Sequence, residues 1–217
     1  MSGRQLPFIG SREPWGSGEK TAQATCLLAP NASAWTLDGT NTWFLRDPAS
    51  QASIVVDPGP DDPAHLEGIA AWAVLTEAPI ACIVLTHGHP DHSAGARRLH
   101  EMTGASVRSL DPQHRQGLEG LADGDVLVAG GLEIRILQTP GHSSDSVCLY
   151  LPAEGTLLTG DTVLGRGTAV IAWPDGDLRA YLHSLERLQV MSEIEHLLPG
   201  HGPMLRNPGE VIAACLL

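Results

Sequence analysis

Lysine is almost absent from this chain: Lys20 is the only lysine among 217 residues, and no run of basic residues exists. Acidic residues outnumber basic ones by 25 to 13, so the net charge is −12 with histidine neutral. Proteins that bind nucleic acid nonspecifically neutralise its phosphates with clustered cations. The composition therefore disfavours RNA or DNA as a general, tightly bound partner.

Long hydrophobic runs are also missing. No stretch approaches the roughly 20 apolar residues of a transmembrane helix. Residues 1–20 are polar and rich in glycine and proline, without the apolar centre of a signal peptide. We therefore expect no membrane span, a flexible N-terminal segment over 1–20 and a single domain over 21–217. A cytoplasmic location is expected from the cysteines, which are described next.

Cysteine is scarce, and the four cysteines have no C-x-x-C spacing. Cys82 and Cys148 lie in apolar runs, where buried free thiols are common. A disulfide framework is not expected at this chain length and cysteine density. We expect all four to stay reduced and to bind no metal: Cys26, Cys82, Cys148 and Cys215.

Apolar runs of strand length, separated by turns, outnumber helical patterns in both halves of the chain. Strands are predicted within 21–30, 41–45, 53–56, 80–85, 125–129, 132–137, 147–151, 156–159 and 196–199. Helices are predicted over 63–77, over 93–102 and after Asp177; Asp62 is a good N-cap, and Pro63 suits the first helical position. Two β-rich halves with fewer helices predict an α/β protein in which two sheets are flanked by helices.

The most informative stretch follows the predicted strand 80–85 and reads Thr86-His87-Gly88-His89-Pro90-Asp91-His92. Open α/β sheets place functional sites in such strand-to-helix loops. Side chains alternate along an extended segment, so His87, His89 and Asp91 would share one side. The turn into the helix can then bring His92 to a neighbouring position, so one loop can begin two adjacent metal sites. Imidazole combined with carboxylate suits Lewis-acidic ions such as zinc.

Three further candidate ligands each follow a glycine at the end of a predicted strand: His142, Asp161 and His201. Any one of them alone is better read as a surface turn. Together with the loop at 86–92 they make five histidines and two aspartates. That set suffices for two metal ions of four- or five-fold coordination that share one carboxylate and one water.

The blocks T-H-G-H-P-D-H, G-H, T-G-D and P-G-H-G, in this order, resemble the metallo-β-lactamase fold superfamily over about residues 26–204. The blocks at 37–43 and 56–59 are similar to one branch, the lactamase-beta-two-like hydrolases, which include a mitochondrial single-strand endoribonuclease. The resemblance implies an αββα sandwich of two mixed β-sheets flanked by helices, with the metals at one edge.

The resemblance also implies how the ligands divide between the two ions. The first ion would be held by His87, His89 and His142. The second would be held by Asp91, His92 and His201, and Asp161 would bridge the two ions. Asp57 matches a family position near the loop and is expected to orient a ligand histidine. The remaining histidines match no ligand motif: His65, His100, His114, His183 and His196.

The expected function is a binuclear metal-dependent hydrolase. A hydroxide that bridges two divalent ions, expected to be zinc with iron or manganese as alternatives, would attack a small ester, thioester or lactone. Asp91 would hold this nucleophile and carry its proton to the leaving group. Two dications with two carboxylates and one hydroxide keep a net positive charge, which suits an anionic small-molecule substrate. The loop 162–176, with Arg166 and Trp173, and the turn 40–43 are candidate pocket walls.

Two other activities stay open. The branch resemblance suggests a phosphodiesterase or endoribonuclease acting on single-stranded RNA, although the missing basic surface counts against it. A mono-iron sulfur dioxygenase is the other, and the complete second ligand set of Asp91, His92 and His201 weakens it. Cleavage of β-lactam antibiotics is not expected, because those members lack the aspartate found here as Asp161 and are secreted. Members of this branch usually continue with a helical extension, whereas this chain stops sixteen residues past His201, so we expect the extension's substrate contacts to be absent or altered.

Overall fold

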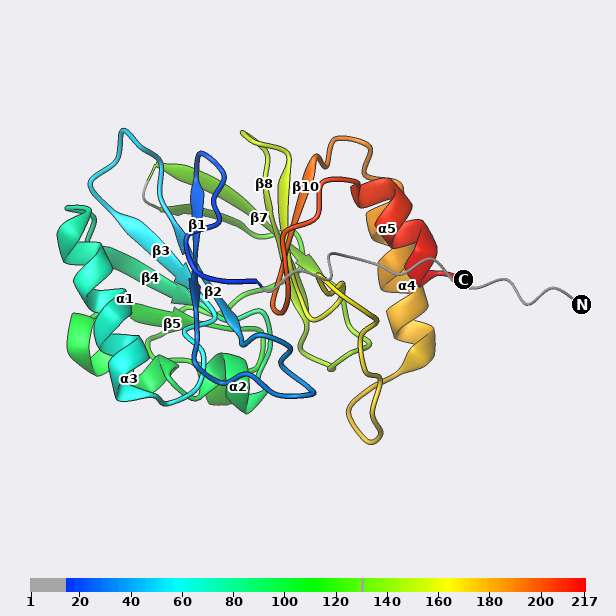
Figure 1. The fold of residues 1–217 in the computed structure, drawn as a ribbon, viewed down its shortest axis with the longest axis horizontal. Helices are drawn as coiled ribbons and strands as arrows, with labels where there is room; N and C mark the ends of the chain where they lie inside the picture. The colour runs from blue at the N-terminus through cyan, green and yellow to red at the C-terminus, as the bar shows by residue number, and fades with distance from the viewer. Residues whose placement is uncertain (1–14, 130) are drawn as a thin grey trace, which may run out of the picture.

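A computed structural model describes residues 15–129 and 131–217. Within these residues, ten strands form two five-stranded sheets, with strand orders β1-β2-β3-β4-β5 and β10-β9-β8-β7-β6. The sheets pack face to face, and helices cover the outer side of each one (Figure 1). The predicted sandwich of two sheets with helices outside is therefore confirmed.

The first sheet contains β1 (Ala24–Leu28), β2 (Asn41–Leu45), β3 (Ser53–Val56), β4 (Ile80–Val84) and β5 (Ser106–Arg108). Strands β1 to β3 are antiparallel, and β3 to β5 are parallel. The parallel connections are made by α1 (Pro63–Leu75), then by α2 (Pro90–Ser93) and α3 (Ala96–Thr103). The loop after β4 and the first residues of α2 hold the His/Asp-rich motif, so this motif lies at the carboxyl end of a buried central strand.

The second sheet contains β6 (Val126–Ala129), β7 (Leu132–Gln138), β8 (Val147–Leu151), β9 (Thr156–Gly160) and β10 (His196–Pro199). Its strands are antiparallel except for the parallel pair β9 and β10. A short 3₁₀ helix, η1 (Pro112–His114), follows β5, and the outer helices of this half are α4 (Leu178–Gln189) and α5 (Pro208–Cys215).

The main core lies between the two sheets and takes side chains from both. On β7, buried and exposed residues alternate, and the buried Leu132, Ile134 and Ile136 meet Trp43 and Leu45 of β2 in one cluster. Two further clusters lie under α1 and α3 on one outer face and under α4 and α5 on the other. Period-two patterning of the strands therefore explains why each sheet has one face toward the centre.

Several local predictions need correction. The single helix predicted over 93–102 is two helices, because α2 begins at Pro90 inside the motif and α3 begins at Ala96. Gly104 ends α3 with a φ of 75°, as expected of a glycine C-cap. Strand β5 has only three residues and was not predicted, and α5 was missed as well. The predicted hairpin at 130–131 is present, with Ala129 opposite Leu132, although Gly130 lies outside the described residues.

The expected flexible segment 1–20 falls partly outside the described residues, which begin at Trp15. Residues 15–20 contact the first sheet: Gly18 N donates to Cys26 O, and Cys26 N donates to Glu19 O. The four cysteines are free, as expected. Among the described helices, none combines the length and the apolar character needed to cross a membrane.

The packing of α4 on the second sheet gives a prediction about stability. Leu185 is fully buried in the outer cluster, whereas Leu178 on the same helix is 61% exposed. Leu185→Ala should lower the free energy of unfolding by about 2–5 kcal/mol, because it removes apolar contacts and leaves a cavity. Leu178→Ala should change it by less than about 0.5 kcal/mol. Urea denaturation of both variants measures the difference, and equal losses would contradict this packing.

Candidate metal centre

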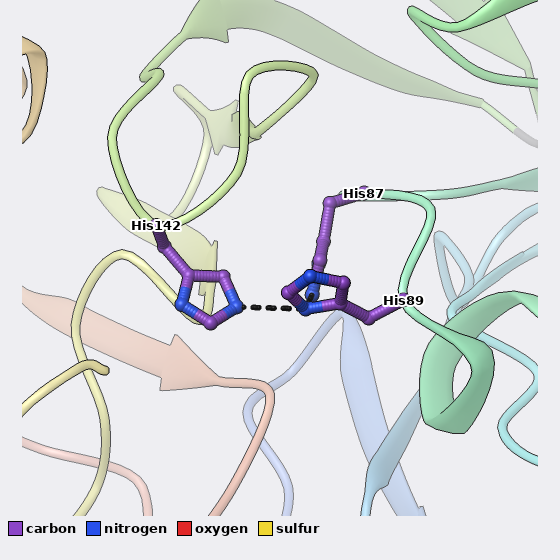
Figure 2. A group of neighbouring side chains, drawn as sticks. All are labelled: His87, His89 and His142. Atoms are coloured by element: carbon purple, nitrogen blue, oxygen red, sulfur yellow. Dashed lines mark hydrogen bonds between the residues drawn. The ribbon is translucent and has the colours of Figure 1, made fainter. Parts of the chain in front are cut away.

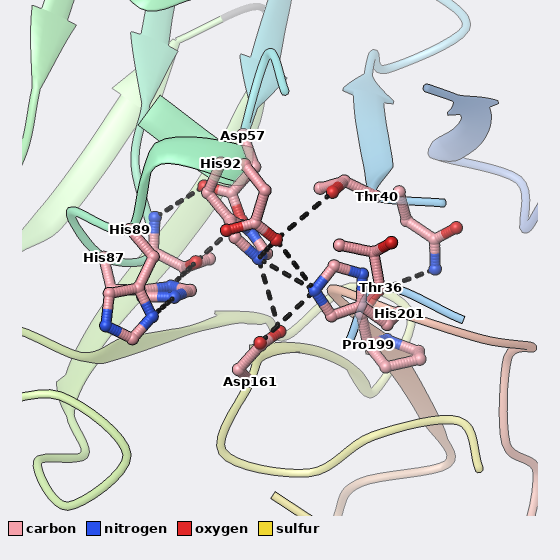
Figure 3. A network of polar contacts seen from close by, with 12 residues as sticks. Thr36, Thr40, Asp57, His87, His89, His92, Asp161, Pro199 and His201 are labelled. Carbon is pink, nitrogen blue, oxygen red and sulfur yellow. Dashed lines mark hydrogen bonds and ion pairs between the residues drawn. The ribbon is translucent and has the colours of Figure 1, made fainter. Parts of the chain in front are cut away.

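The structure brings all seven candidate ligands together at one edge of the sandwich, where strands of both sheets end. Figure 3 labels five of them, His87, His89, His92, Asp161 and His201, and Figure 2 adds His142. His87, His89, Asp91 and His92 come from the loop after β4 and from α2. His142 lies in the loop between β7 and β8, Asp161 directly follows β9, and His201 follows β10. Their ligand atoms form three overlapping groups: His87, His89 and His142; His87, His92 and Asp161; and Asp91, His92 and His201.

In the first group three imidazole nitrogens converge (Figure 2). His89 Nδ1 lies 3.1 Å from His87 Nε2 and 3.0 Å from His142 Nε2. His142 Nδ1 donates to Val170 O at 2.7 Å, since a carbonyl oxygen can only accept. His87 Nδ1 lies 3.0 Å from the Thr86 hydroxyl, whose proton is used in a 2.6 Å bond to Asp57, so His87 is the donor. With Nδ1 as the donor, a neutral ring at either His87 or His142 points a bare Nε2 lone pair at His89 Nδ1.

One proton on His89 Nδ1 cannot satisfy two such lone pairs. A cation placed between the three nitrogens would satisfy all of them. Tetrahedral zinc with Zn–N bonds of about 2.0–2.1 Å places its donor atoms about 3.4 Å apart. The observed nitrogen separations of 3.0 and 3.1 Å are close to that spacing. The first group therefore fits a metal ion in the chemistry of its donors and in its size.

The group of Asp91, His92 and His201, called the second ligand group from here on, has the same character, with a carboxylate in place of one imidazole. His92 Nε2 lies 3.2 Å from His201 Nε2, and Asp91 Oδ2 lies 3.4 Å from the former and 3.2 Å from the latter. The Nδ1 atoms of both histidines already have partners: His92 Nδ1 donates to Asp57 Oδ2 at 2.9 Å, and His201 Nδ1 donates to Gly39 O at 3.1 Å. Both Nε2 atoms are thereby left to face the centre.

Asp161 lies between the two groups. Its Oδ2 is 3.3 Å from His201 Nε2 and 3.7 Å from His142 Nε2, and its Oδ1 is 3.4 Å from His92 Nε2. Oδ1 is buried, and within the part of the chain that the structure describes it has no hydrogen-bond partner. A buried carboxylate oxygen without a hydrogen bond is costly. Its position beside donors of both groups is what a bridging ligand requires, so the residues fit two adjacent ions.

Asp57 connects the two groups from behind. Its Oδ2 accepts from His92 Nδ1 at 2.9 Å and from the Thr86 hydroxyl at 2.6 Å, and its Oδ1 accepts from Thr86 N at 2.8 Å. Through Thr86 the same carboxylate also reaches His87. Such outer contacts fix the tautomer and the orientation of ligand histidines. From the sequence, Asp57 is expected near the loop, but no role is expected for Thr86, the residue immediately before the first histidine of the motif.

Charge determines how these groups titrate without a metal. Burial alone would lower the pKa of His92 and His201, but the carboxylate of Asp161, with that of Asp57 beside His92 and that of Asp91 beside His201, outweighs it. The pKa of His92 lies well above its usual value, and that of His201 rises to about 9. Burial raises the pKa of Asp161, yet His92 and His201 hold the net pKa well below its usual range. Protons on these two histidines thus balance the buried carboxylate.

At two positions directly before a candidate ligand, close packing leaves no room for a side chain, so glycine is required there. A Cβ on Gly200 would lie 2.4 Å from Asp161 Oδ1 and 2.7 Å from His92 Cε1. A Cβ on Gly160 would lie 2.7 Å from the Thr86 hydroxyl oxygen, and Gly160 has a φ of 48°. The backbone before His201 and Asp161 therefore touches the loop of the first sheet directly.

A pocket of about 320 Å³ opens onto the centre. Five of the candidate ligands line it, and the remaining lining residues are apolar: Trp35, Leu164, Val170 and Ala172. The loop 162–176 is a pocket wall as predicted, but its lining residues are not the two expected. Trp173 is 89% exposed and does not line the pocket, and Arg166 forms an ion pair with Asp38 instead.

The turn 40–43, which was the other predicted wall, does not line the pocket. Trp43 is buried in the core between the sheets, with Nε1 donating to Pro199 O at 3.0 Å. The neighbouring wall residue is Trp35, which sequence reasoning missed. Trp35 lies in the loop between β1 and β2, and the available signal was a tryptophan shortly before the turn residues Asp38 and Gly39. In the structure its side chain is 75% exposed.

The family model of the metallo-beta-lactamase superfamily matches residues 35–201, which is well over half of the chain. The chain belongs to this superfamily. Membership implies divalent metal ions, and the convergent His and Asp groups are where this chain could hold them.

Relatives and solved structures agree with this assignment. The atrochrysone carboxyl ACP thioesterase AgnL7 of Paecilomyces divaricatus is 33% identical over 85% of this chain and 57% of its own length. The beta-lactamase-like protein 2 homolog of Drosophila melanogaster is 32% identical over 87% of this chain and 67% of its own. This chain thus spans little more than half of the thioesterase. A metallo-beta-lactamase family protein of Thermus thermophilus shares the fold, with a TM-score of 0.77 and 21% identity over 89% of this chain and 78% of that one.

The raised pKa values predict that metal binding releases protons. Below about pH 9, His201 carries a proton in the metal-free protein, and the raised pKa of His92, caused by the neighbouring Asp161 and Asp57, favours a proton on that ring too. A ligand imidazole must give up that proton, so metal affinity should rise with pH by about tenfold per pH unit for each proton released, until pH passes the pKa. Calorimetric titration in buffers of different ionisation enthalpy counts the protons. Release of none near neutral pH would contradict this charge arrangement.

Proposed function

We propose that this protein is a two-metal hydrolase that cleaves a small ester, thioester or lactone, and that a thioester is the favoured substrate. The single observation that carries the proposal is the position of Asp161, a buried carboxylate that contacts donors of both ligand groups. When bound, two divalent ions would polarise the attacked carbonyl oxygen and lower the pKa of a shared water to about 7. The name of the thioesterase relative supports the choice of substrate.

The ligands would divide as the resemblance implies. His87, His89 and His142 would hold the first ion, and Asp91, His92 and His201 the second, with Asp161 between them and Asp57 behind His92 and Thr86. We infer zinc as the metal, because imidazole nitrogen and carboxylate oxygen without thiolate suit it; iron and manganese are the alternatives. A mono-iron oxygenase would leave the second group without a role, so that alternative is disfavoured.

Asp91 is the residue placed to move a proton. One oxygen, Oδ2, lies 3.2 Å from His201 Nε2 and 3.4 Å from the Thr40 hydroxyl. The side chain is 30% exposed and belongs to the pocket lining, so it can reach both the centre and a bound substrate. A carboxylate in this position can take the proton of the attacking water and deliver it to the leaving group.

The pocket supports an apolar acyl group in the substrate. Among the described residues that line it, none is lysine or arginine, and four are apolar: Trp35, Leu164, Val170 and Ala172. Negative charge develops on the carbonyl oxygen during the reaction, and the positive charge of the metal centre would stabilise it. The same positive charge would attract the anionic substrate that we expect. A long polyanion such as RNA would find no lysine or arginine in this described lining, so the endoribonuclease alternative is not favoured. A cytoplasmic location remains our inference from the free cysteines.

The proposal is tested by metal analysis combined with a substrate panel. Metal-replete protein should bind two ions per chain and hydrolyse acyl thioesters faster than lactones, phosphodiesters or single-stranded RNA. A single iron with an empty second site under replete conditions would overturn the two-metal reading. Preferential cleavage of RNA would overturn the thioesterase reading while keeping the two ions.

Asp161→Asn tests the bridging carboxylate. Asparagine keeps the shape but removes one negative charge and one anionic ligand, so one of the two ions should bind more weakly. Hydrolysis should fall by about 100-fold or more, because the arrangement of charge around the reacting group is lost. Metal content and rate are measured on the same preparation. Full activity with two ions bound would refute the bridging role.

Trp35→Ala tests the apolar wall. Trp35 should contribute to binding of the acyl group and not to the chemical step, so the loss should appear in KM with kcat little changed. We expect KM for a large aromatic or branched acyl thioester to rise about tenfold, and KM for an acetyl thioester to change less. Trp173→Ala is the matched control, because Trp173 is exposed and does not line the pocket. Equal effects of both variants would contradict the assignment.

A further inference from the structure

Asn41 carries a buried amide group that joins the two sheets beside the candidate metal centre. It is the first residue of β2, and its side chain is fully buried. Nδ2 donates to Pro199 O at 2.9 Å and to Gly202 O at 2.8 Å, and the backbone N donates to Gly200 O at 2.7 Å. One residue of the first sheet thus binds three carbonyl groups around His201, in the segment 199–202 at the end of β10.

Chemistry allows this amide only one orientation. Two carbonyl oxygens can only accept, so they require the amide nitrogen on their side. Asn41 Oδ1 on the other side accepts from Trp15 Nε1 at 2.8 Å and from Cys26 Sγ at 3.4 Å. Both protons and the oxygen of the amide are therefore used. A buried polar group whose partners are all in place fixes one arrangement of the segments that it connects.

His201 depends on the segment that Asn41 holds. Its Nδ1 donates to Gly39 O, and Thr40 forms a β-bridge with it. On the side of its own sheet, Gly200 N donates to Gly160 O and Gly165 N donates to His201 O, each at 2.8 Å. Asp91 belongs to the half of the molecule built on the first sheet, so the 3.2 Å separation of His201 Nε2 from Asp91 Oδ2 also depends on where the segment rests against that sheet. Figure 3 shows Pro199 next to His201 on this side of the site.

The first ligand group does not share this support. His87 and His89 lie on the loop after β4, and His142 is held by Val170 O. None of these residues lies in the segment 199–202. A change confined to the amide of Asn41 should therefore reach one ligand group much more than the other.

We propose that Asn41 is a positioning residue for the second ion: its amide holds His201 at ligand distance from Asp91 and His92. The inference deepens the proposed function and rests on its assignment of one ion to each ligand group. Asn41 touches neither ion nor substrate in this arrangement and acts through the backbone of segment 199–202.

Asn41→Asp tests the proposal, because the carboxyl group has the same shape but places an oxygen where two carbonyl groups require a donor. Titration of metal-free protein with Co²⁺, followed by visible absorption and elemental analysis, reports each site without any substrate. The second ion should bind about 10–100-fold more weakly, the usual effect of losing an outer partner of a ligand, while the first ion keeps its affinity.

Ser53→Ala is the matched control. Ser53 is fully buried, and its hydroxyl donates to Ala78 O at 2.8 Å at the other end of the same sheet. This variant also removes a buried hydrogen bond to a backbone carbonyl, so it should lower thermal stability and leave both cobalt affinities unchanged. If Asn41→Asp does not fold, Asn41→Ser, whose hydroxyl can still donate one bond, should give a smaller shift in the same direction.

Unchanged cobalt affinities in a folded Asn41 variant, or equal weakening of both ions, would overturn the inference. A wild-type protein that binds one cobalt ion would overturn it too, because no second ion would exist to be positioned. Failure of the proposed hydrolase activity is a separate outcome. A wild-type protein that binds two ions but cleaves no member of the substrate panel would refute the function and leave the role of Asn41 standing.

Discussion

The buried carboxylate of Asp161 is the constraint on which the rest of the centre depends. An ionised carboxylate inside a protein costs several kcal/mol unless opposite charge compensates it. In the metal-free structure, protons on His92 and His201 supply that charge, as their raised pKa values indicate. Divalent ions would supply it more fully and would also satisfy the oxygen that has no hydrogen bond among the described residues. Charge balance and connection between the two ligand groups are thus properties of one side chain.

The sandwich makes this arrangement possible because its two sheets contribute ligands in different ways. The first sheet delivers four ligands from one continuous segment, the loop after β4 and the start of α2, and Asp57 directly after β3 holds this segment from behind. The second sheet delivers His142, Asp161 and His201 from the ends of three separate strands, so these meet the loop only when the sheets are packed. Contacts across the sheets, such as those of Asn41 and Trp43 with Pro199 O, lie directly beside the centre. Packing of the core and assembly of the site are therefore coupled.

Much of the fold and of the ligand set could be predicted from the sequence because both leave local signals. Alternating burial along β7 and the dense His and Asp pattern after β4 need no knowledge of distant residues. The missed elements lacked such signals: β5 has three residues, and the predicted helix 93–102 is divided where Gly95 packs against Gly59 O and Pro60 O. The wrong wall residues have another cause. Trp43 and Trp35 are both tryptophans in or near one turn, and only tertiary packing decides which is buried.

The supporting contacts mark the limit of reading function from sequence. The amide of Asn41 acts on Pro199, 158 positions away, and no motif at either residue announces the pair. Pocket walls have the same difficulty, because Trp35 and Val170 lie on loops, where residues are set by the substrate more than by the fold. In the function that we propose, metal chemistry would belong to the buried strand ends, and substrate choice would belong to the pocket-lining loops 29–40 and 162–176. A change of substrate could arise in these loops without altering a single histidine or aspartate of the centre.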